Sequence, residues 1–146
     1  MDLRKLDRVP GVASVMTPFP YSVGIDAPVG DAQALIRQHG IRHVPVRDGE
    51  QIVGVVTDRD IALGVGPDGD EARVSVRKIC ATDPYMVDIH APLDSVVHEM
   101  AARNVGSAIV LRNGKLAGIF TVTDACRILG NILVRRFRNP DDDEAA

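Results

Sequence analysis

The chain has 146 residues, of which 45% are hydrophobic and 25% are charged, a composition typical of a folded globular protein. Its net charge of −3 provides no overall attraction to nucleic acid or to an anionic membrane, and no apolar run reaches the roughly 20 residues of a membrane-spanning helix. An aromatic content of 3%, without tryptophan, argues against a base-stacking surface for single-stranded nucleic acid.

Residues 1–8 carry mixed charge and lack an apolar core of signal-peptide length, so we expect a cytoplasmic protein. The two cysteines, Cys80 and Cys126, do not form a Cys-x-x-Cys pair. We therefore expect two buried apolar thiols, without a disulfide framework or a zinc site.

The main feature of the sequence is an internal repeat: residues 12–60 align with residues 76–124 without a gap, at a spacing of 64. Repetition of this kind fixes the architecture of a chain before any local pattern does. Identical pairs include Tyr21/Tyr85, Val23/Val87, Val46/Val110, Gly54/Gly118, Thr57/Thr121 and Asp60/Asp124. We divide the chain into a first repeat, a linker, a second repeat, and a helix end with an acidic tail: residues 10–65, 66–75, 76–130 and 131–146.

Each repeat predicts the order strand, helix, strand, strand, helix. In the first repeat Val23 and Ile25 predict a short strand, and Pro28 lies near the first turn of a helix, where its missing N–H costs little. In the second repeat the helix has an apolar stripe formed by Leu93, Val96, Val97, Met100 and Ala101. Gly40 and Asn104 occupy matching positions just past these helices, where a left-handed residue is favoured.

A hairpin follows the helix in both copies, with an Asp48-Gly49 turn in the first and an Asn113-Gly114 turn in the second. One copy of about 50 residues would bury too little surface to be stable alone. We therefore predict an α/β (α+β) fold in which two β-α-β-β-α repeats pack sheet to sheet around a pseudo-twofold axis. The cleft between the copies is a natural ligand site.

The most specific motif is Gly54-Val-Val-Thr57-Asp-Arg-Asp60, repeated as Gly118-Ile-Phe-Thr121-Val-Thr-Asp124. A Thr three residues before an acid at a helix start predicts a capping box, which would by itself explain both residue types. The same residues can also bind a ligand, because the helix N-terminus and the Thr hydroxyl suit a phosphate, and the Asp can accept both hydrogens of a ribose diol. The glycine would then let the ligand approach the backbone.

With these motifs, Ile41-Arg-His-Val-Pro-Val46 and Met16-Thr17-Pro18, the chain resembles a stand-alone pair of CBS (cystathionine-β-synthase) domains over residues 10–130. The resemblance implies a regulatory module without a cofactor that binds an adenosine-containing ligand, such as AMP, ADP, ATP or S-adenosylmethionine, in two clefts. In that family each cleft joins the Thr-x-x-Asp of one copy to the first-strand segment of the other copy and to the residues before its second strand. Pairs commonly dimerise into a four-domain disc.

Carried over to this chain, the resemblance assigns two sets of nucleotide-binding residues. The first cleft consists of Thr57, Arg59, Asp60, Tyr85, Met86, Val87, Val105, Gly106 and Ser107. The second cleft consists of Thr121, Thr123, Asp124, Tyr21, Ser22, Val23, Ile41, Arg42 and His43. The tyrosines could form a wall for adenine, or they could belong to the ordinary half-buried core.

The two copies differ where a ligand would bind. Arg59 corresponds to Thr123, and Arg42-His43 correspond to Gly106-Ser107, so that each cleft receives one basic element. Because Arg59 lies at a helix start, we expect the first cleft to bind phosphate more tightly. The replacement of Pro45 by Ile109 in the second copy also predicts a difference in cleft shape.

We expect a binding protein rather than an enzyme, since the sequence has no nucleophile elbow and no P-loop lysine. The histidines, His39, His43, His90 and His98, lack the spacing of metal ligands. Two alternatives stay open: a ligand-independent scaffold or partner-binding module with degenerate clefts, and a small metal-dependent enzyme. An apolar stripe predicts a homodimer, and an effector protein would be a further partner. The stripe consists of Ile128, Leu129, Ile132, Leu133 and Phe137.

Overall fold

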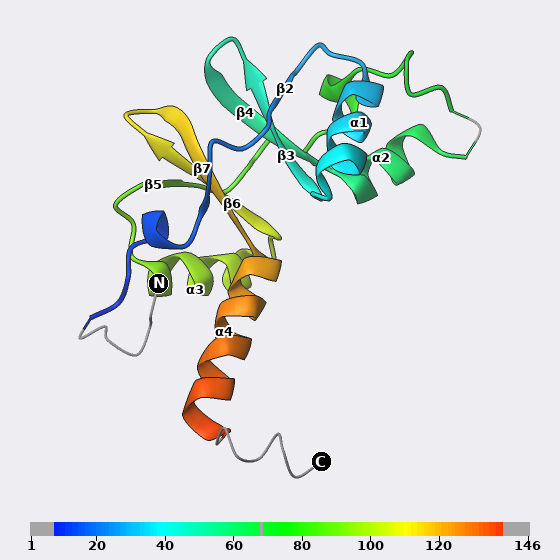
Figure 1. Ribbon diagram of the computed structural model, residues 1–146. Coiled ribbons are helices and arrows are strands. Elements are labelled where there is room, and N and C mark those ends of the chain that lie inside the picture. The colour runs from blue at the N-terminus through cyan, green and yellow to red at the C-terminus, as the bar shows by residue number, and fades with distance from the viewer. Residues whose placement is uncertain (1–7, 68, 139–146) are drawn as a thin grey trace.

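The computed structural model describes residues 8–67 and 69–138, which form two sheets flanked by helices (Figure 1). The first repeat contributes β2 (Val23–Gly24), α1 (Val29–His39), β3 (His43–Asp48), β4 (Gln51–Thr57) and α2 (Asp58–Val65). The second contributes β5 (Met86–Asp88), α3 (Leu93–Arg103), β6 (Ser107–Arg112), β7 (Lys115–Thr121) and α4 (Val122–Phe137). The predicted order of elements and the mixed α/β class are confirmed. The acidic residues 141–144 lie outside the described residues.

Both sheets follow the same pairing. β2 pairs in parallel with β3, and β3 pairs antiparallel with β4; β5, β6 and β7 repeat this arrangement. Asn113 and Gly114 form the predicted turn with positive φ values of 51° and 78°. In the first hairpin β3 includes Asp48, so the turn is Gly49-Glu50, one residue later than predicted.

Helices α1 and α3 begin after Pro28 and Pro92, which provide no side-chain cap. Their first N–H groups are satisfied by the chain that leads into the opposite repeat. Val29 N donates to Val74 O at 2.8 Å, and Leu93 N donates to Pro10 O at 2.9 Å. Residues of the predicted linker therefore dock on α1 and complete its N-terminus.

The two repeats exchange their leading segments. Val12, in the short 3-10 helix Val12–Ser14, is fully buried in the core of the second repeat, and Val76, in Val76–Lys78, is fully buried in the core of the first. The short strand β1 (Thr17–Pro18) then pairs antiparallel with β7. The repeats of the sequence are thus interlocked in space, because each completes the core of the other.

This exchange corrects one expectation. A Cβ on Gly54 would lie 2.6 Å from the backbone oxygen of Ala81, and a Cβ on Gly118 would overlap the side chain of Met16. The motif glycines therefore make room for the segment crossing from the other repeat, and not for a ligand. Among the described helices, none combines the length and the hydropathy that a membrane crossing requires.

Candidate functional site

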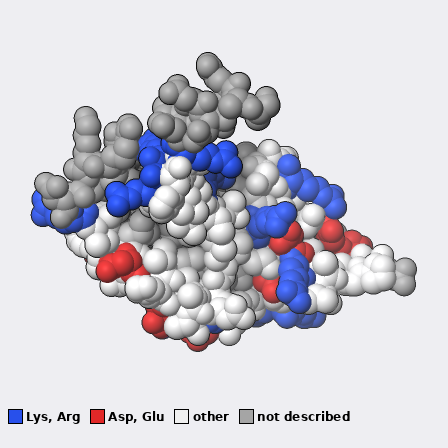
Figure 2. Space-filling model, turned by 90° about the horizontal axis from the view of Figure 1, so that it is seen from below, with Lys and Arg blue, Asp and Glu red and all other residues white. Residues whose placement is uncertain are grey.

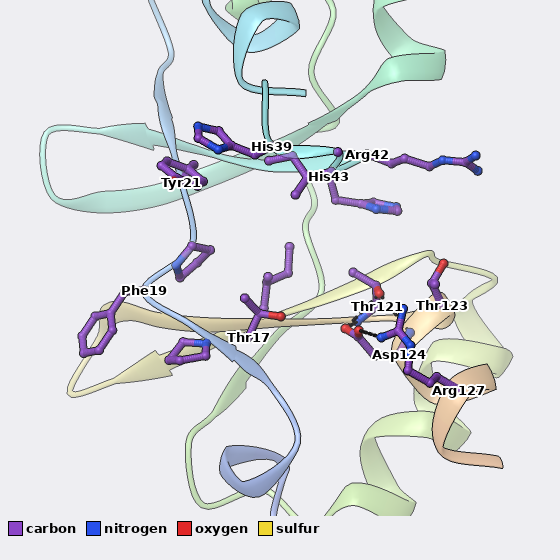
Figure 3. Close-up of a pocket in the computed structure, with 15 residues that line it drawn as sticks. Thr17, Phe19, Tyr21, His39, Arg42, His43, Thr121, Thr123, Asp124 and Arg127 are labelled. Atoms are coloured by element: carbon purple, nitrogen blue, oxygen red, sulfur yellow. Dashed lines mark hydrogen bonds and ion pairs between the residues drawn. The ribbon is translucent and has the colours of Figure 1, made fainter. Parts of the chain in front are cut away.

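A cleft of about 760 Å³ lies between the two repeats (Figure 3). The crossing segment 17–21 forms one side of it, the end of α1 and the start of β3 form the roof, and the end of β7 with the start of α4 forms the floor. The lining residues are Thr17, Pro18, Phe19, Pro20, Tyr21, His39, Gly40, Ile41, Arg42, His43, Ile119, Thr121, Thr123, Asp124 and Arg127.

The floor is the predicted capping box. Thr121 N donates to Asp124 Oδ2 at 2.9 Å, Thr121 Oγ1 donates to the same oxygen at 2.9 Å, and Asp124 N donates to Thr121 Oγ1 at 3.2 Å. The other carboxylate oxygen, Oδ1, accepts a hydrogen bond from Arg127 Nη1 at 3.3 Å. Both oxygens of Asp124 therefore have partners within the protein, and a bound diol has to compete with Arg127 for Oδ1.

The roof carries the basic pair Arg42-His43. The His43 ring lies against Gly106 of the second repeat, since a Cβ on that glycine would lie 2.6 Å from His43 Nε2. The small residue of one copy thus makes room for the large residue of the other. Burial holds the pKa of His43 below its ordinary value, although the nearby carboxylates of Asp58, Asp60 and Asp124 oppose this.

An aromatic pair lies at the Tyr21 end of the cleft. The rings of Tyr21 and His39 stack with centroids 3.8 Å apart and an interplanar angle of 11°. In the second repeat the equivalent Tyr85 lies 4.8 Å below the guanidinium of Arg103, whose Nε also donates to Glu99 at 2.8 Å. Phe19 is 89% exposed at the rim of the cleft and has a positive φ of 49°. In Figure 3, Phe19 lies at one end of the cleft, and the side chains of Arg42 and Arg127 lie at the other end.

Two predicted residues of this cleft, Ser22 and Val23, are not part of its lining. The hydroxyl of Ser22 accepts a hydrogen bond from Arg47 Nε at 3.3 Å, and Val23 is buried in the core of the first repeat. Tyr21, Ile41, Arg42, His43, Thr121, Thr123 and Asp124 do come together there.

The sequence analysis missed His39, Arg127, Phe19 and Thr17, although all four line the cleft. A comparison of the two copies could have found Arg127, because Leu63 occupies the equivalent position in the first repeat. The position of β1 depends on the exchange of segments, which no local pattern signals.

Most residues predicted for the Thr57 cleft lie in secondary-structure elements equivalent to those of their counterparts in the Thr121 cleft. Thr57 and Asp60 form a second capping box, with bonds of 2.9 and 3.1 Å. Arg59 is exposed, and Asp58 Oδ1 accepts a hydrogen bond from its backbone N–H. Met86 and Val87 lie in β5, and Ser107 is 6% exposed in β6.

Pro45 and Ile109 give the two copies different backbone pairing at one edge of the clefts. Ile109 N donates to Tyr85 O at 2.9 Å, which extends the pairing of β5 with β6. Pro45 stands at the equivalent position and has no N–H to donate. The Tyr21 carbonyl therefore cannot accept a corresponding hydrogen bond from position 45, and β2 begins only at Val23.

No group of three or more potential metal ligands is found within residues 8–67 and 69–138. Cys80 is half-buried, and this burial raises the pKa of its thiol. The expectation of a second buried thiol is wrong, because Cys126 is exposed on α4. Both cysteines are free thiols.

The profile of the CBS domain matches the chain twice, at residues 12–65 and 76–131. The chain belongs to the CBS-domain family. YlbB, an uncharacterized protein of Bacillus subtilis (strain 168), is 32% identical over 99 residues, which are 66% of each chain. The CBS domain of a bacterial CNNM/CorC family Mg²⁺ transporter in complex with ATP is 31% identical, with a TM-score of 0.71 over 82% of this chain and 87% of that chain.

A second solved structure shares the fold at lower identity. The CBS domain pair of protein MJ0100, in complex with 5′-methylthioadenosine and S-adenosyl-L-methionine, is 21% identical, with a TM-score of 0.76 over 85% of this chain and 98% of that chain. Both of these CBS structures are complexes with small-molecule ligands, and this chain has two sheets and four helices, as CBS domain pairs do.

Proposed function

We propose that this CBS-domain pair is a regulatory module that binds an adenine nucleotide in the cleft between β1, the β3 start and the α4 start. The observation that carries the proposal is the convergence, in one cleft of about 760 Å³, of the Asp124 carboxylate from one repeat with Tyr21 and Arg42 from the other. A cavity of this size lies within the range of small-molecule sites.

The chemistry of the lining fits the three parts of a nucleotide. The Asp124 carboxylate is an acceptor for the two ribose hydroxyls. Arg42 and the N-terminus of α4 provide positive charge for a phosphate, and the His43 ring can donate a hydrogen bond to it. The stacked rings of Tyr21 and His39 offer an aromatic surface for the base at the opposite end. The CNNM/CorC CBS domain whose structure is a complex with ATP supports the same ligand class.

The sequence predicts tighter phosphate binding in the Thr57 cleft, but the charges that line the Thr121 cleft favour the opposite order. The equivalent positions around Thr57 carry Arg59 and Arg103, but also Asp60 and Asp83. The Thr121 cleft also has two arginines, Arg42 and Arg127, but only one acid among its lining residues, Asp124. We therefore expect the phosphate-bearing ligand to prefer the Thr121 cleft.

Calorimetric titration with AMP, ADP, ATP and S-adenosylmethionine tests the proposal. We expect at least one of these ligands to bind, and Asp124→Asn to weaken binding by roughly 1–3 kcal/mol while keeping an acceptor for the cap. Asp94→Ala is the matched control, because Asp94 is an exposed acid in the first turn of α3 and does not line the cleft.

Two outcomes contradict the proposal. Absence of binding by every ligand at millimolar concentration would favour the scaffold with degenerate clefts. Unchanged affinity in Asp124→Asn would mean that this acid is a helix cap and nothing more.

We also propose that the module works as a homodimer through α4. None of the residues of α4 is fully buried, and Leu129, Leu133 and Phe137 are 55%, 47% and 76% exposed. Figure 2 looks onto the end of α4, where an uncharged strip of surface lies beside Lys and Arg side chains. An apolar stripe of this kind is typical of an interface, and a ligand in the cleft at the base of α4 could bias how two copies pack.

A further inference from the structure

The ion pair between Asp124 and Arg127 separates two cavities. Arg127 Nη1 lies 3.3 Å from Asp124 Oδ1, and both side chains line the cleft as well as a smaller groove of about 260 Å³. The groove runs along α4 beside the end of the 3-10 helix Val12–Ser14. Its other lining residues are Ser14, Val15, Ile128, Asn131 and Arg135. Arg127 therefore lies at the junction between the nucleotide cleft and a groove that contains a second arginine.

The fold does not require an arginine at position 127. The first repeat forms the same capping box with Leu63 at the equivalent position, and Leu63 is 76% exposed. Arg127 is thus one of the differences between two helix starts that share a capping box, and it lies in the cleft that has fewer acidic side chains.

The hydrogen bonds of Asp124 define what happens when a ligand arrives. Oδ2 is held by two donors of Thr121, so Oδ1 is the oxygen that a ribose diol has to reach, and Arg127 occupies it. The Arg127 side chain is 67% exposed, and ion pairs of such exposure are weak. A diol can therefore displace the guanidinium, which then requires a new anionic partner.

We propose that Arg127 is a specificity-determining residue that binds the terminal phosphates of a nucleoside di- or triphosphate, once the ribose has displaced it from Asp124. The inference rests on the proposed function and names its ligand class. The first phosphate is held near Arg42 and His43, which lie at the same end of the cleft as Arg127 in Figure 3. The groove along α4 gives the end of the phosphate chain a place to lie, and a planar guanidinium suits it.

The test is the affinity of wild type and of Arg127→Leu for adenosine, AMP and ATP, measured by calorimetry. Leucine is the residue that the first repeat uses at this position. We expect wild type to bind ATP more tightly than AMP. In Arg127→Leu we expect ATP to bind about ten-fold or more weakly, since a charge-assisted contact is lost. Adenosine should bind up to about five-fold more tightly, because no ion pair has to be broken.

The opposite signs separate a ligand contact from a structural effect, which would shift all ligands in the same direction. Arg127→Lys should keep part of the preference for ATP, because the charge remains. Arg136→Ala removes the same charge from α4 at a position outside both cavities, so it should leave the affinities for adenosine, AMP and ATP unchanged. Equal affinities for AMP and ATP in wild type, or equal changes in Arg127→Leu, would overturn this inference alone. Absence of binding by all three ligands would overturn the proposed function with it.

Discussion

The two motif glycines allow a sharp test of how the repeats interlock. Gly54 and Gly118 are equivalent in sequence, but their neighbours across the repeat interface differ. A Cβ at position 54 would lie 2.6 Å from a backbone oxygen, that of Ala81, whereas at position 118 it would overlap the far end of the Met16 side chain. A backbone atom cannot rotate away, and a thioether can.

The expected loss of stability in Gly54→Ala can be estimated from the hydrogen bonds that the added Cβ would disturb. Ala81 and Val55 exchange two backbone hydrogen bonds of 2.9 and 3.0 Å, and each contributes about 1 kcal/mol. Gly54→Ala should therefore lower the free energy of unfolding by about 2–3 kcal/mol, from the strained or lost bonds and the overpacking together. Gly118→Ala should cost about 1 kcal/mol or less, because Met16 can adopt another rotamer.

Equilibrium unfolding in urea, followed by circular dichroism at one fixed protein concentration, measures both changes. Gly24→Ala is the control, because nothing lies within 4 Å of a Cβ at that position. If Gly118→Ala destabilised the protein as much as Gly54→Ala, the reasoning would be wrong. The loss of stability would then not depend on whether the added Cβ meets a backbone atom or a flexible side chain.

Three further predictions concern the helix caps, pH and assembly. Asp60→Ala and Asp124→Ala should each lower the free energy of unfolding by about 1 kcal/mol, since both capping boxes have the bonds from Thr N to Asp Oδ2 and from Asp N to Thr Oγ1; a cost confined to one variant would contradict this. Burial lowers the pKa of His43, so the unfolded chain takes up a proton more readily than the folded one below pH 6.5, and stability should fall as the pH decreases from there. His43→Gln should flatten that dependence, and the exposed His90→Gln should not; equal profiles would refute the assignment. Sedimentation at tens of micromolar should give twice the 15.7 kDa mass for wild type and a monomer for Leu133→Glu, and a wild-type mass near 15.7 kDa would exclude the dimer.

Much of the fold could be predicted from the sequence because the relevant signals are local and occur twice. The apolar stripe of α3, the left-handed residues Gly40 and Asn104, and the turn at Asn113 each depend on the backbone conformation of a few neighbouring residues. The capping boxes at Thr57 and Thr121 are of the same kind, since both partners lie within one helical turn. The repeat then indicated that two similar units pack together.

The composition of the cleft could be predicted only in part. The resemblance to the CBS family indicated Tyr21, Arg42 and Asp124, which the structure brings together. It did not indicate His39 or Arg127, because their importance arises from contacts with Tyr21 and Asp124 that are specific to one of the two copies.

Tertiary structure alone decided how the two copies are joined. The sequence pattern places Val12 and Val76 at the start of their own repeats, but each side chain is buried in the core of the other repeat. From sequence alone, Gly54 and Gly118 could equally provide space for a ligand. In the structure, segments that cross from the other repeat occupy the space beside them. The physical reason is that a short leading segment is stabilised by burying its apolar side chain and by pairing its backbone with an open sheet edge or an uncapped helix. Local sequence does not specify which of the two copies provides that edge and that helix.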